Sequence, residues 1–398
     1  MKQLIIFIVH NVYSGFIDNV DSGFSNSLGI DEINAYGSFL MIQGIMYCVY
    51  SLGTYCYRVK QEKEKLCFRI SIVSGIITGI IAILAIQLVG YIYNLTEMQI
   101  QLLKNILLVY GCMVPFYAIG DFLSEYMTIR TKNKKMIVSS ILYYIMLIGT
   151  DMLVIKLHAG IEWLVACTGI CYIVYDIIVY IVSGIREERA NDINKEVIID
   201  VLRHGKDVVL ARLYAKVGVL VYGAYASRLG SELYAIHNVC YTCGYFGENF
   251  TNGLYTYIVV RLKHVSKVKI RWKKMWDIVR VYGLQVLVAG YIGSLLAIIP
   301  LKGALSIQDC TPWLFVYCLE VISLVMYESY SAFLTVEEET KYIARGGIVG
   351  LIVRIIYVVA GFNIYKGIWV FATAVTLDYA IRGVYLGYQG RKVYNTNT

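Results

Sequence analysis

Long apolar runs separated by short charged segments are the dominant feature of this 398-residue sequence. An α-helix needs about 20 residues to cross the hydrocarbon core of a membrane. Cut at charge clusters and turn residues, the runs predict twelve spanning helices near residues 4–26, 35–57, 70–93, 105–128, 136–156, 159–184, 207–229, 233–260, 279–301, 311–335, 342–362 and 366–388. The expected fold is an all-α polytopic membrane protein, which leaves no room for a large soluble domain.

The distribution of basic residues predicts the orientation of these helices. The net charge is +8, and most of the 36 Lys and Arg residues fall in the two termini and in the loops that follow even-numbered helices. By the positive-inside rule, both termini are expected in the cytoplasm. The basic balance therefore reflects membrane topology and contact with anionic lipid heads. It does not indicate a nucleic-acid partner.

The sequence lacks the motifs of an enzyme or of an ATP-driven pump. Neither a Walker A motif nor a G-x-G-x-x-G motif occurs. The five histidines are scattered, and the C-x-x-C formed by Cys240 and Cys243 has no second pair, so we interpret it as packing. We expect no enzymatic activity, no metal and no cofactor. Any transport would be facilitated or driven by a coupling ion, H⁺ or Na⁺.

Two weak internal repeats relate the first part of the chain to the second. Residues 28–36 resemble 229–235, and residues 124–129 resemble 331–336, both at an offset of about 200. The repeats predict an N-terminal six-helix bundle (1–190), a cytoplasmic linker (191–206) and a C-terminal six-helix bundle (207–398). Since six helices return the chain to the same side, a pseudo-twofold axis along the membrane normal is expected. A substrate would then bind between the bundles.

The repeat residues also carry a resemblance to a known family. The segments are Asn19 to Phe24 followed by Leu28-Gly29 and 31–37, then 229–238, and Pro115 to Ala118 with Leu123-Ser124. They resemble motifs of the multidrug and toxin extrusion (MATE) family, within the multidrug/oligosaccharidyl-lipid/polysaccharide (MOP) flippase superfamily. The resemblance implies multidrug efflux by antiport across a bacterial plasma membrane.

The resemblance also implies a cation or proton site. The family has an Asp in the first helix and another in the fifth, and the matching residues here are Asp21 and Asp151. The family's neighbouring Asn and Pro are Leu147 and Met152 in this chain, a departure that weakens a sodium cage more than a proton site. The acidic residues that some members carry in the second half match Ala215 and Leu324 here.

Ionisable residues inside predicted spans give independent candidates, since each is costly in the membrane unless it faces protein or water. Asp18 and Asp21 lie three residues apart and share a helix face, so together they could take up a proton. Alternatively, Asp18 is hydrated near the outer end of its helix. Asp121 and Glu125 share another face, and we expect Glu125 to be hydrated.

Basic residues in the second half form another candidate site. Arg212 and Lys216 are four residues apart and need acidic partners or an anionic substrate. The acidic candidates for this cavity are Glu248, Glu320, Glu328 and Asp378. The alternative is an interhelical salt-bridge cluster. Asp378 and Arg382 are also four apart and predict a local ion pair, whereas Arg354 and Asp176 have no partner that spacing can identify.

Two transport functions and one other function remain open. The first is a secondary-active exporter that exchanges protons, or sodium, for an amphipathic drug-like solute, with Asp21 and Asp151 binding the ion. The second is a flippase for lipid-linked oligosaccharides, in which Arg212, Lys216, Arg354 and Arg382 would neutralise a diphosphate. The third is a membrane scaffold without transport. The expected partners are a small-molecule solute and membrane lipids, and the expected state is a monomer.

Overall fold

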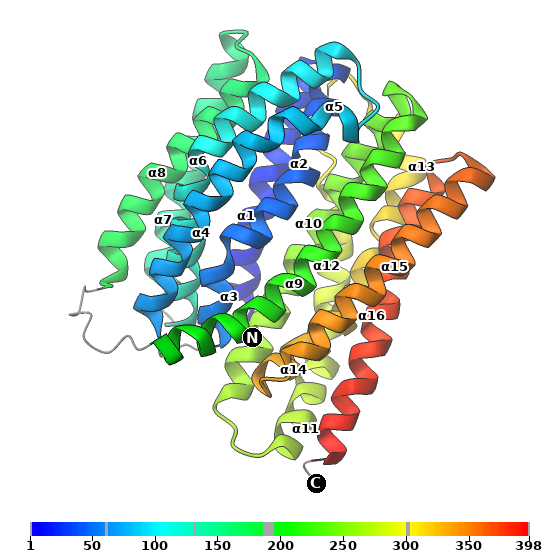
Figure 1. The fold of residues 1–398 in the computed structure, drawn as a ribbon. Coiled ribbons are helices and arrows are strands. Elements are labelled where there is room, and N and C mark those ends of the chain that lie inside the picture. The colour runs from blue at the N-terminus through cyan, green and yellow to red at the C-terminus, as the bar shows by residue number, and fades with distance from the viewer. Residues whose placement is uncertain (1, 60–62, 131–132, 186–194, 300–302, 397–398) are drawn as a thin grey trace. The chain divides into compact units, whose positions relative to one another are not determined.

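The structure is a computed structural model that describes residues 2–59, 63–130, 133–185, 195–299 and 303–396 (Figure 1). Within these ranges it does not describe the side chains of residues 2, 3, 6, 10, 13–19, 133, 134, 136, 137, 195 and 204. All regular structure in the described ranges is helical. This confirms the all-α class.

Each of the twelve predicted spans coincides with a helix or with a run of consecutive helices. Eight helices of the described residues are long and apolar enough to cross a membrane, or nine if the bent pair α2 (Ile30–Tyr50) and α3 (Leu52–Val59) is one span. The other three predicted spans fall in α1, α10 and α16. Helix α10 carries Glu248 and Asn249, and α16 carries Asp378 and Arg382. These polar side chains lower the mean hydropathy of the two helices. The count of twelve spans stays a prediction.

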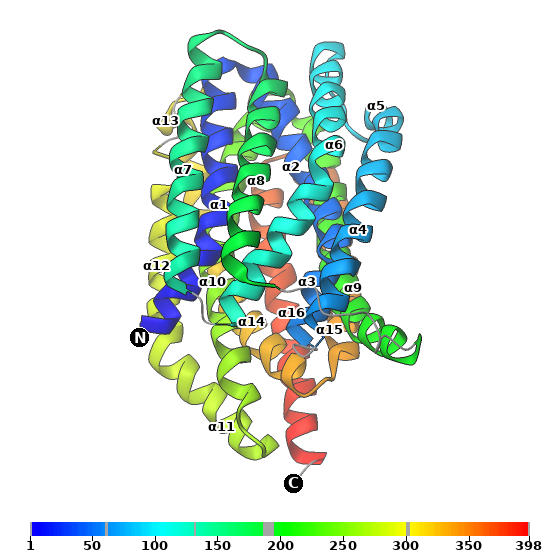
Figure 2. The same ribbon diagram turned by 90° about the vertical axis from the view of Figure 1, so that its left-hand side faces the viewer.

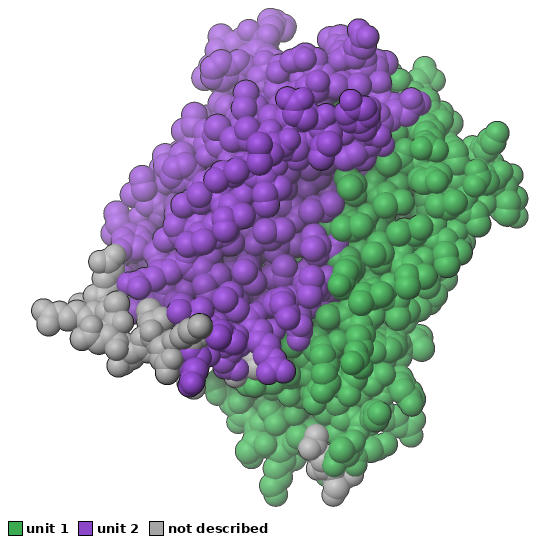
Figure 3. Space-filling model, viewed as in Figure 1, with its two compact units in different colours: residues 1–38, 214–398 green, residues 39–213 purple. Residues whose placement is uncertain are grey.

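The chain forms two compact units, residues 1–38 with 214–398 (unit 1) and residues 39–213 (unit 2) (Figure 3). Helices α2 and α9 (Lys195–Ala226) each run through a boundary. The two units therefore differ from the predicted bundles, because α1 (Lys2–Leu28) belongs to unit 1, where it packs against α10. The predicted bundles stay a prediction, and residues 191–194 of the predicted linker lie outside the described residues.

Unit 1 is organised around α10. Besides α1 and parts of α2 and α9, its elements are η2 (Ser227–Leu229), α10 (Ser231–Lys263), α11 (Val268–Ile278), the π-helix η3 (Val279–Gly283), α12 (Leu284–Leu296), α13 (Ile307–Tyr317), α14 (Glu320–Val336), α15 (Thr340–Tyr365) and α16 (Trp369–Thr396). Helix α10 packs against α1, α12 and α14, and α16 packs against α14 and α15. Figure 2 shows α1 and α10 from the side.

Unit 2 is organised around α6. Its elements besides parts of α2 and α9 are α3, α4 (Glu64–Ala85), η1 (Ile86–Leu88), α5 (Val89–Ile92), α6 (Glu97–Ile129), α7 (Asn133–Lys156) and α8 (Ile161–Ser183). Helix α6 packs against α4 and α8, and α7 packs against α8. A Cβ atom on Gly79 of α4 would lie 2.5 Å from the carbonyl oxygen of Gly111 in α6. Gly79 thus permits close packing of α4 against α6.

The repeated motifs mark equivalent turns between helices. Gly29 separates α1 from α2 and Gly230 separates η2 from α10, and in each case a leucine ends the preceding helix. Gly230 has a φ of 93°, which side-chain-bearing residues rarely adopt, so a glycine suits this turn. The repeat in the sequence therefore reflects a repeated helix–turn–helix in the fold.

Candidate functional site

Three deeply buried charges of unit 1 form a group that we call the Arg–Asp–Arg triad (Arg354, Asp378, Arg382). Their side chains are at most 1% exposed. Arg354 Nη2 lies 2.5 Å from Asp378 Oδ2, and Arg382 Nη2 donates to the same oxygen at 2.9 Å. Arg382 Nε also donates to Asp378 Oδ1. The predicted Asp378–Arg382 ion pair is confirmed, and the structure supplies the partner of Arg354 that spacing could not identify.

Helix α15 leaves room for the triad at Gly350. A Cβ atom at this position would overlap Arg382 Nε and Asp378 Oδ1, because the two side chains lie against the bare backbone. Arg354 also donates from Nη1 to the carbonyl oxygen of Ala215 at 3.2 Å, which ties α15 to α9. Through Arg354, the triad therefore connects α15 to α16 and to α9. Both arginines stabilise the packing of these helices.

A second group of charges in unit 1 involves Lys216, Glu248 and Glu320. Lys216 Nζ lies 4.0 Å from Glu248 Oε2 and 4.3 Å from the centroid of the Tyr245 ring, so the ammonium has both an acidic and an aromatic neighbour. Glu320 is 5% exposed and interacts electrostatically with Glu248, Lys216 and Arg354. A Cβ atom on Gly244 would lie 3.0 Å from Glu320 Oε1, so this glycine permits the approach of α14 to α10.

Glu328 and Arg212 complete the predicted set of cavity residues. Glu328 is fully buried on α14, two turns after Glu320. Arg212 belongs to unit 2 and interacts electrostatically with Tyr55 of α3. Within unit 1, the structure thus brings together Lys216, Glu248 and Glu320 from the predicted set.

Asp21 occupies a buried polar position near the end of α1. Its side chain is 3% exposed, and Oδ2 accepts a hydrogen bond from the Tyr36 hydroxyl at 3.2 Å. The side chain of Asp18 lies outside the described residues, so the proposed Asp18–Asp21 pair stays a prediction. Asp151 is fully buried on α7 in unit 2. A joint ion site of Asp21 and Asp151 stays a prediction as well.

The two repeated motifs contact each other inside unit 1. Asn34 Nδ2 donates to the Ser231 carbonyl at 3.0 Å, and Asn238 Nδ2 donates to Asn34 Oδ1 at 3.3 Å. The hydroxyls of Ser38 and Tyr234 are 2.8 Å apart. The residues that carry the family resemblance therefore form a buried polar seam between α2 and α10, close in sequence to the Asp21–Tyr36 hydrogen bond.

Unit 2 holds an ion pair that the sequence did not reveal. Arg58 donates to both carboxylate oxygens of Glu125, from Nε at 2.8 Å and from Nη2 at 3.0 Å. The Glu125 side chain is only 4% exposed, so the prediction that it is hydrated is wrong. Arg58 lies within α3, whereas the predicted span ends at residue 57. Asp121, one turn before Glu125, accepts from Thr54 at 2.9 Å.

Asp176 on α8 is also buried, but its surroundings differ from those of Glu125. It is 6% exposed, and neither carboxylate oxygen has a hydrogen-bond partner among the described residues. A Cβ atom on Gly120 of α6 would overlap Asp176 Oδ1, so the carboxylate lies against bare backbone. The nearby aromatic rings of α6, α7 and α8 contact one another, with centroid distances of 4.7 Å for Tyr117–Tyr172 and 5.1 Å for Tyr143–Tyr172.

Comparison by sequence identifies no relative of this chain: no family model matches it, and no curated protein matches it. Comparison by structure, in contrast, finds transporters of similar fold. A MOP superfamily transporter from Pyrococcus furiosus, described by a binding pocket of reverse polarity that suggests a different function, superposes with a TM-score of 0.77. The sequence identity is 14%, with 99% of this chain and 96% of that chain covered.

Multidrug resistance MATE family transporters of the MOP superfamily superpose similarly. An outward-facing conformation gives a TM-score of 0.76 at 12% identity, covering 100% of this chain and 96% of that chain. An inward-facing conformation gives 0.75 at 12% identity, covering 97% and 95%. Over nearly its whole length, this chain has the fold of the MATE transporters of the MOP superfamily.

Proposed function

We propose that this protein is a secondary-active exporter of the bacterial plasma membrane, with both termini in the cytoplasm. It exchanges protons, or sodium, for an amphipathic organic solute of cationic character. The fold of MATE transporters, the apolar helices and the positive-inside distribution of Lys and Arg support this proposal. The buried charges of unit 1 support the exporter over the flippase.

The observation that carries the proposal is the excess of acidic over basic side chains in the interior of unit 1. Among its described residues, the buried basic side chains are Lys216, Arg354 and Arg382, and the buried acidic ones are Asp21, Glu248, Glu320, Glu328 and Asp378. Both arginines contact Asp378, and Lys216 contacts Glu248. An acidic interior suits a cationic solute and leaves little free positive charge for a diphosphate.

In the proposed mechanism, ion binding shifts the balance between outward-open and inward-open states. Asp21 and Asp151 would lose charge when they bind the ion, and a state that binds it more tightly would become more populated. One charge moving down a potential of 100 mV supplies about 2.3 kcal/mol. That free energy sustains a solute gradient of about fifty-fold.

The alternative is a flippase for lipid-linked oligosaccharides. It requires a basic cavity formed by Arg212, Lys216, Arg354 and Arg382. The Pyrococcus furiosus transporter shows that pocket polarity differs between proteins of this fold, so polarity is an informative criterion. Three of these residues, Lys216, Arg354 and Arg382, belong to unit 1, and each of them already contacts a carboxylate. This favours the exporter.

The test is solute efflux from proteoliposomes under an imposed proton gradient, with cationic dyes as probes. We expect the wild type to transport and Asp21→Asn to lose most of its activity, since the amide cannot exchange a proton. Glu232→Gln is the matched control, because Glu232 is an exposed carboxylate at the start of α10 in the same unit. If folded wild-type protein shows no gradient-dependent efflux of any cationic dye, the exporter proposal fails, and lipid-linked substrates become the next to test.

A further inference from the structure

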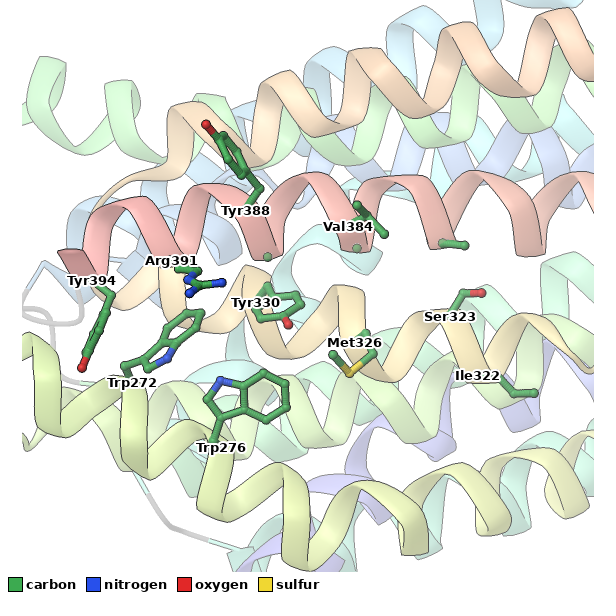
Figure 4. A pocket seen from close by; sticks show the side chains of 13 residues that line it. Trp272, Trp276, Ile322, Ser323, Met326, Tyr330, Val384, Tyr388, Arg391 and Tyr394 are labelled. Carbon is green, nitrogen blue, oxygen red and sulfur yellow. The ribbon is translucent and has the colours of Figure 1, made fainter. Parts of the chain in front are cut away.

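A groove of about 870 Å³ lies on unit 1 between α11, α14 and α16 (Figure 4). Its volume is within the range of small-molecule sites, about 300–1,000 Å³. None of the charged residues discussed above lines it. The groove is therefore a separate candidate site.

Small residues form part of the α16 wall of the groove. Ala380, Gly383 and Gly387 follow at intervals of three and four residues, so they share a helix face. The wall opposite them is α14, where Ile322 and Met326 line the groove one turn apart. These two side chains and the glycine face give this part of the groove an apolar surface.

The other end of the groove is aromatic and basic. Trp272 stacks on Tyr330 with ring centroids 6.0 Å apart, and Trp276 meets the same ring edge-on at 5.9 Å. Arg391 and Tyr394 lie at this end, as Figure 4 shows, whereas Ile322 lies at the opposite end. Trp and Tyr concentrate where a membrane meets water, so this end of the groove is expected at the level of the lipid headgroups.

Further basic side chains adjoin this end. Lys269 and Lys273 are exposed on α11 and precede Trp272 and Trp276 by three residues each, which makes them neighbours on the helix surface. Lys392 is exposed beside Arg391. The positive charge complements an anionic headgroup, and the apolar end suits an acyl chain.

We propose that this groove binds one anionic glycerophospholipid, with its phosphate at Arg391 and an acyl chain along Met326 and Ile322. The inference rests on the proposed insertion in the membrane and not on ion coupling or solute transport. The positive-inside distribution assigns the lipid to the cytoplasmic leaflet, because both the C-terminal end of α16 and the loop before α11 are expected on that side.

The test is native mass spectrometry of the purified full chain, in detergent, with equal amounts of phosphatidylglycerol and phosphatidylcholine. We expect wild-type protein to retain one phosphatidylglycerol in preference to phosphatidylcholine. Arg391→Gln should lower that preference about fivefold, the usual effect of one basic residue at an anionic membrane surface. Ala380→Trp should reduce retention of both lipids, because the indole would fill the apolar end.

Arg228→Gln is the matched control, since it removes an exposed arginine of the same unit that does not line the groove. The proposal is overturned if Arg391→Gln and Ala380→Trp retain lipid as the wild type does, or if Arg228→Gln loses as much as Arg391→Gln. A mass of two chains that disappears in Ala380→Trp would assign the groove to a second copy and would also overturn it. The measurement uses neither solute nor gradient, so its failure is independent of the transport assay.

Discussion

Asp378 in unit 1 and Asp176 in unit 2 are both buried aspartates on predicted membrane helices, but their surroundings differ. Asp378 accepts hydrogen bonds from Arg382 and contacts Arg354. Asp176 has no hydrogen-bond partner among the described residues, and the bare backbone of Gly120 lies against it. A buried charge is stable when it is paired, whereas an unpaired carboxyl group is buried at lower cost when it is neutral.

The two carboxyl groups therefore differ in what their protonation would cost. Protonation of Asp378 would break the triad and leave two arginines without their counter-charge. Protonation of Asp176 breaks no ion pair seen in the described part of the chain. The triad therefore requires a charged carboxylate at Asp378, whereas the carboxyl group of Asp176 can be neutral without the loss of a hydrogen bond seen among the described residues.

The largest expected effect comes from removing the carboxylate of the triad. Asp378→Asn leaves Arg354 and Arg382 buried without a counter-charge, and breaking a buried ion pair in this way costs about 3–5 kcal/mol. Thermal unfolding in detergent, followed by circular dichroism, should show a clearly lower midpoint than in the Glu232→Gln control. A midpoint equal to that of the control would contradict the structural role of the triad.

A smaller effect is expected when the space for the triad is reduced. Gly350→Ala places a methyl group where Arg382 Nε and Asp378 Oδ1 lie, and forcing such a displacement typically costs about 1–3 kcal/mol. The matched control is Gly149→Ala in α7, where no atom of the described residues lies within 4 Å of the added Cβ atom. The same unfolding measurement should separate the two variants, and equal midpoints would argue against close packing at Gly350.

The smallest effect is expected at Asp176. Asp176→Asn removes no hydrogen bond seen among the described residues, so the free energy of unfolding should change by less than about 1 kcal/mol. Circular dichroism of this variant beside Asp378→Asn compares the two aspartates directly. A loss of stability as large as that of Asp378→Asn would show that Asp176 has a strong partner, and the contrast between the units would disappear.

The sequence predicts local features of this fold well. Apolar runs locate the helices, and the four-residue spacing of Asp378 and Arg382 predicts their ion pair, because neighbours on one helix depend only on helix geometry. The repeated motifs also locate equivalent turns, since their glycines occupy the breaks between helices. These features need no knowledge of how distant segments pack.

Contacts between distant segments could not be predicted from one sequence. Arg354 meets Asp378 across α15 and α16, and Arg58 meets Glu125 across α3 and α6. The spacing does not predict the pair Arg58–Glu125, because the predicted span 35–57 ends one residue before Arg58. The burial of Asp176 beside Gly120 likewise depends on how α8 packs against α6, which spacing along one helix cannot show.

The aromatic end of the groove has a spectroscopic consequence. Of the five tryptophans in the sequence, Trp272 and Trp276 line the groove, and Trp313 and Trp369 form a close pair elsewhere in unit 1, with ring centroids 4.8 Å apart. Only Trp163 belongs to unit 2, where its side chain is 55% exposed. Tryptophan emission is thus weighted toward unit 1, and two of its emitters would sense a brominated acyl chain as a quencher.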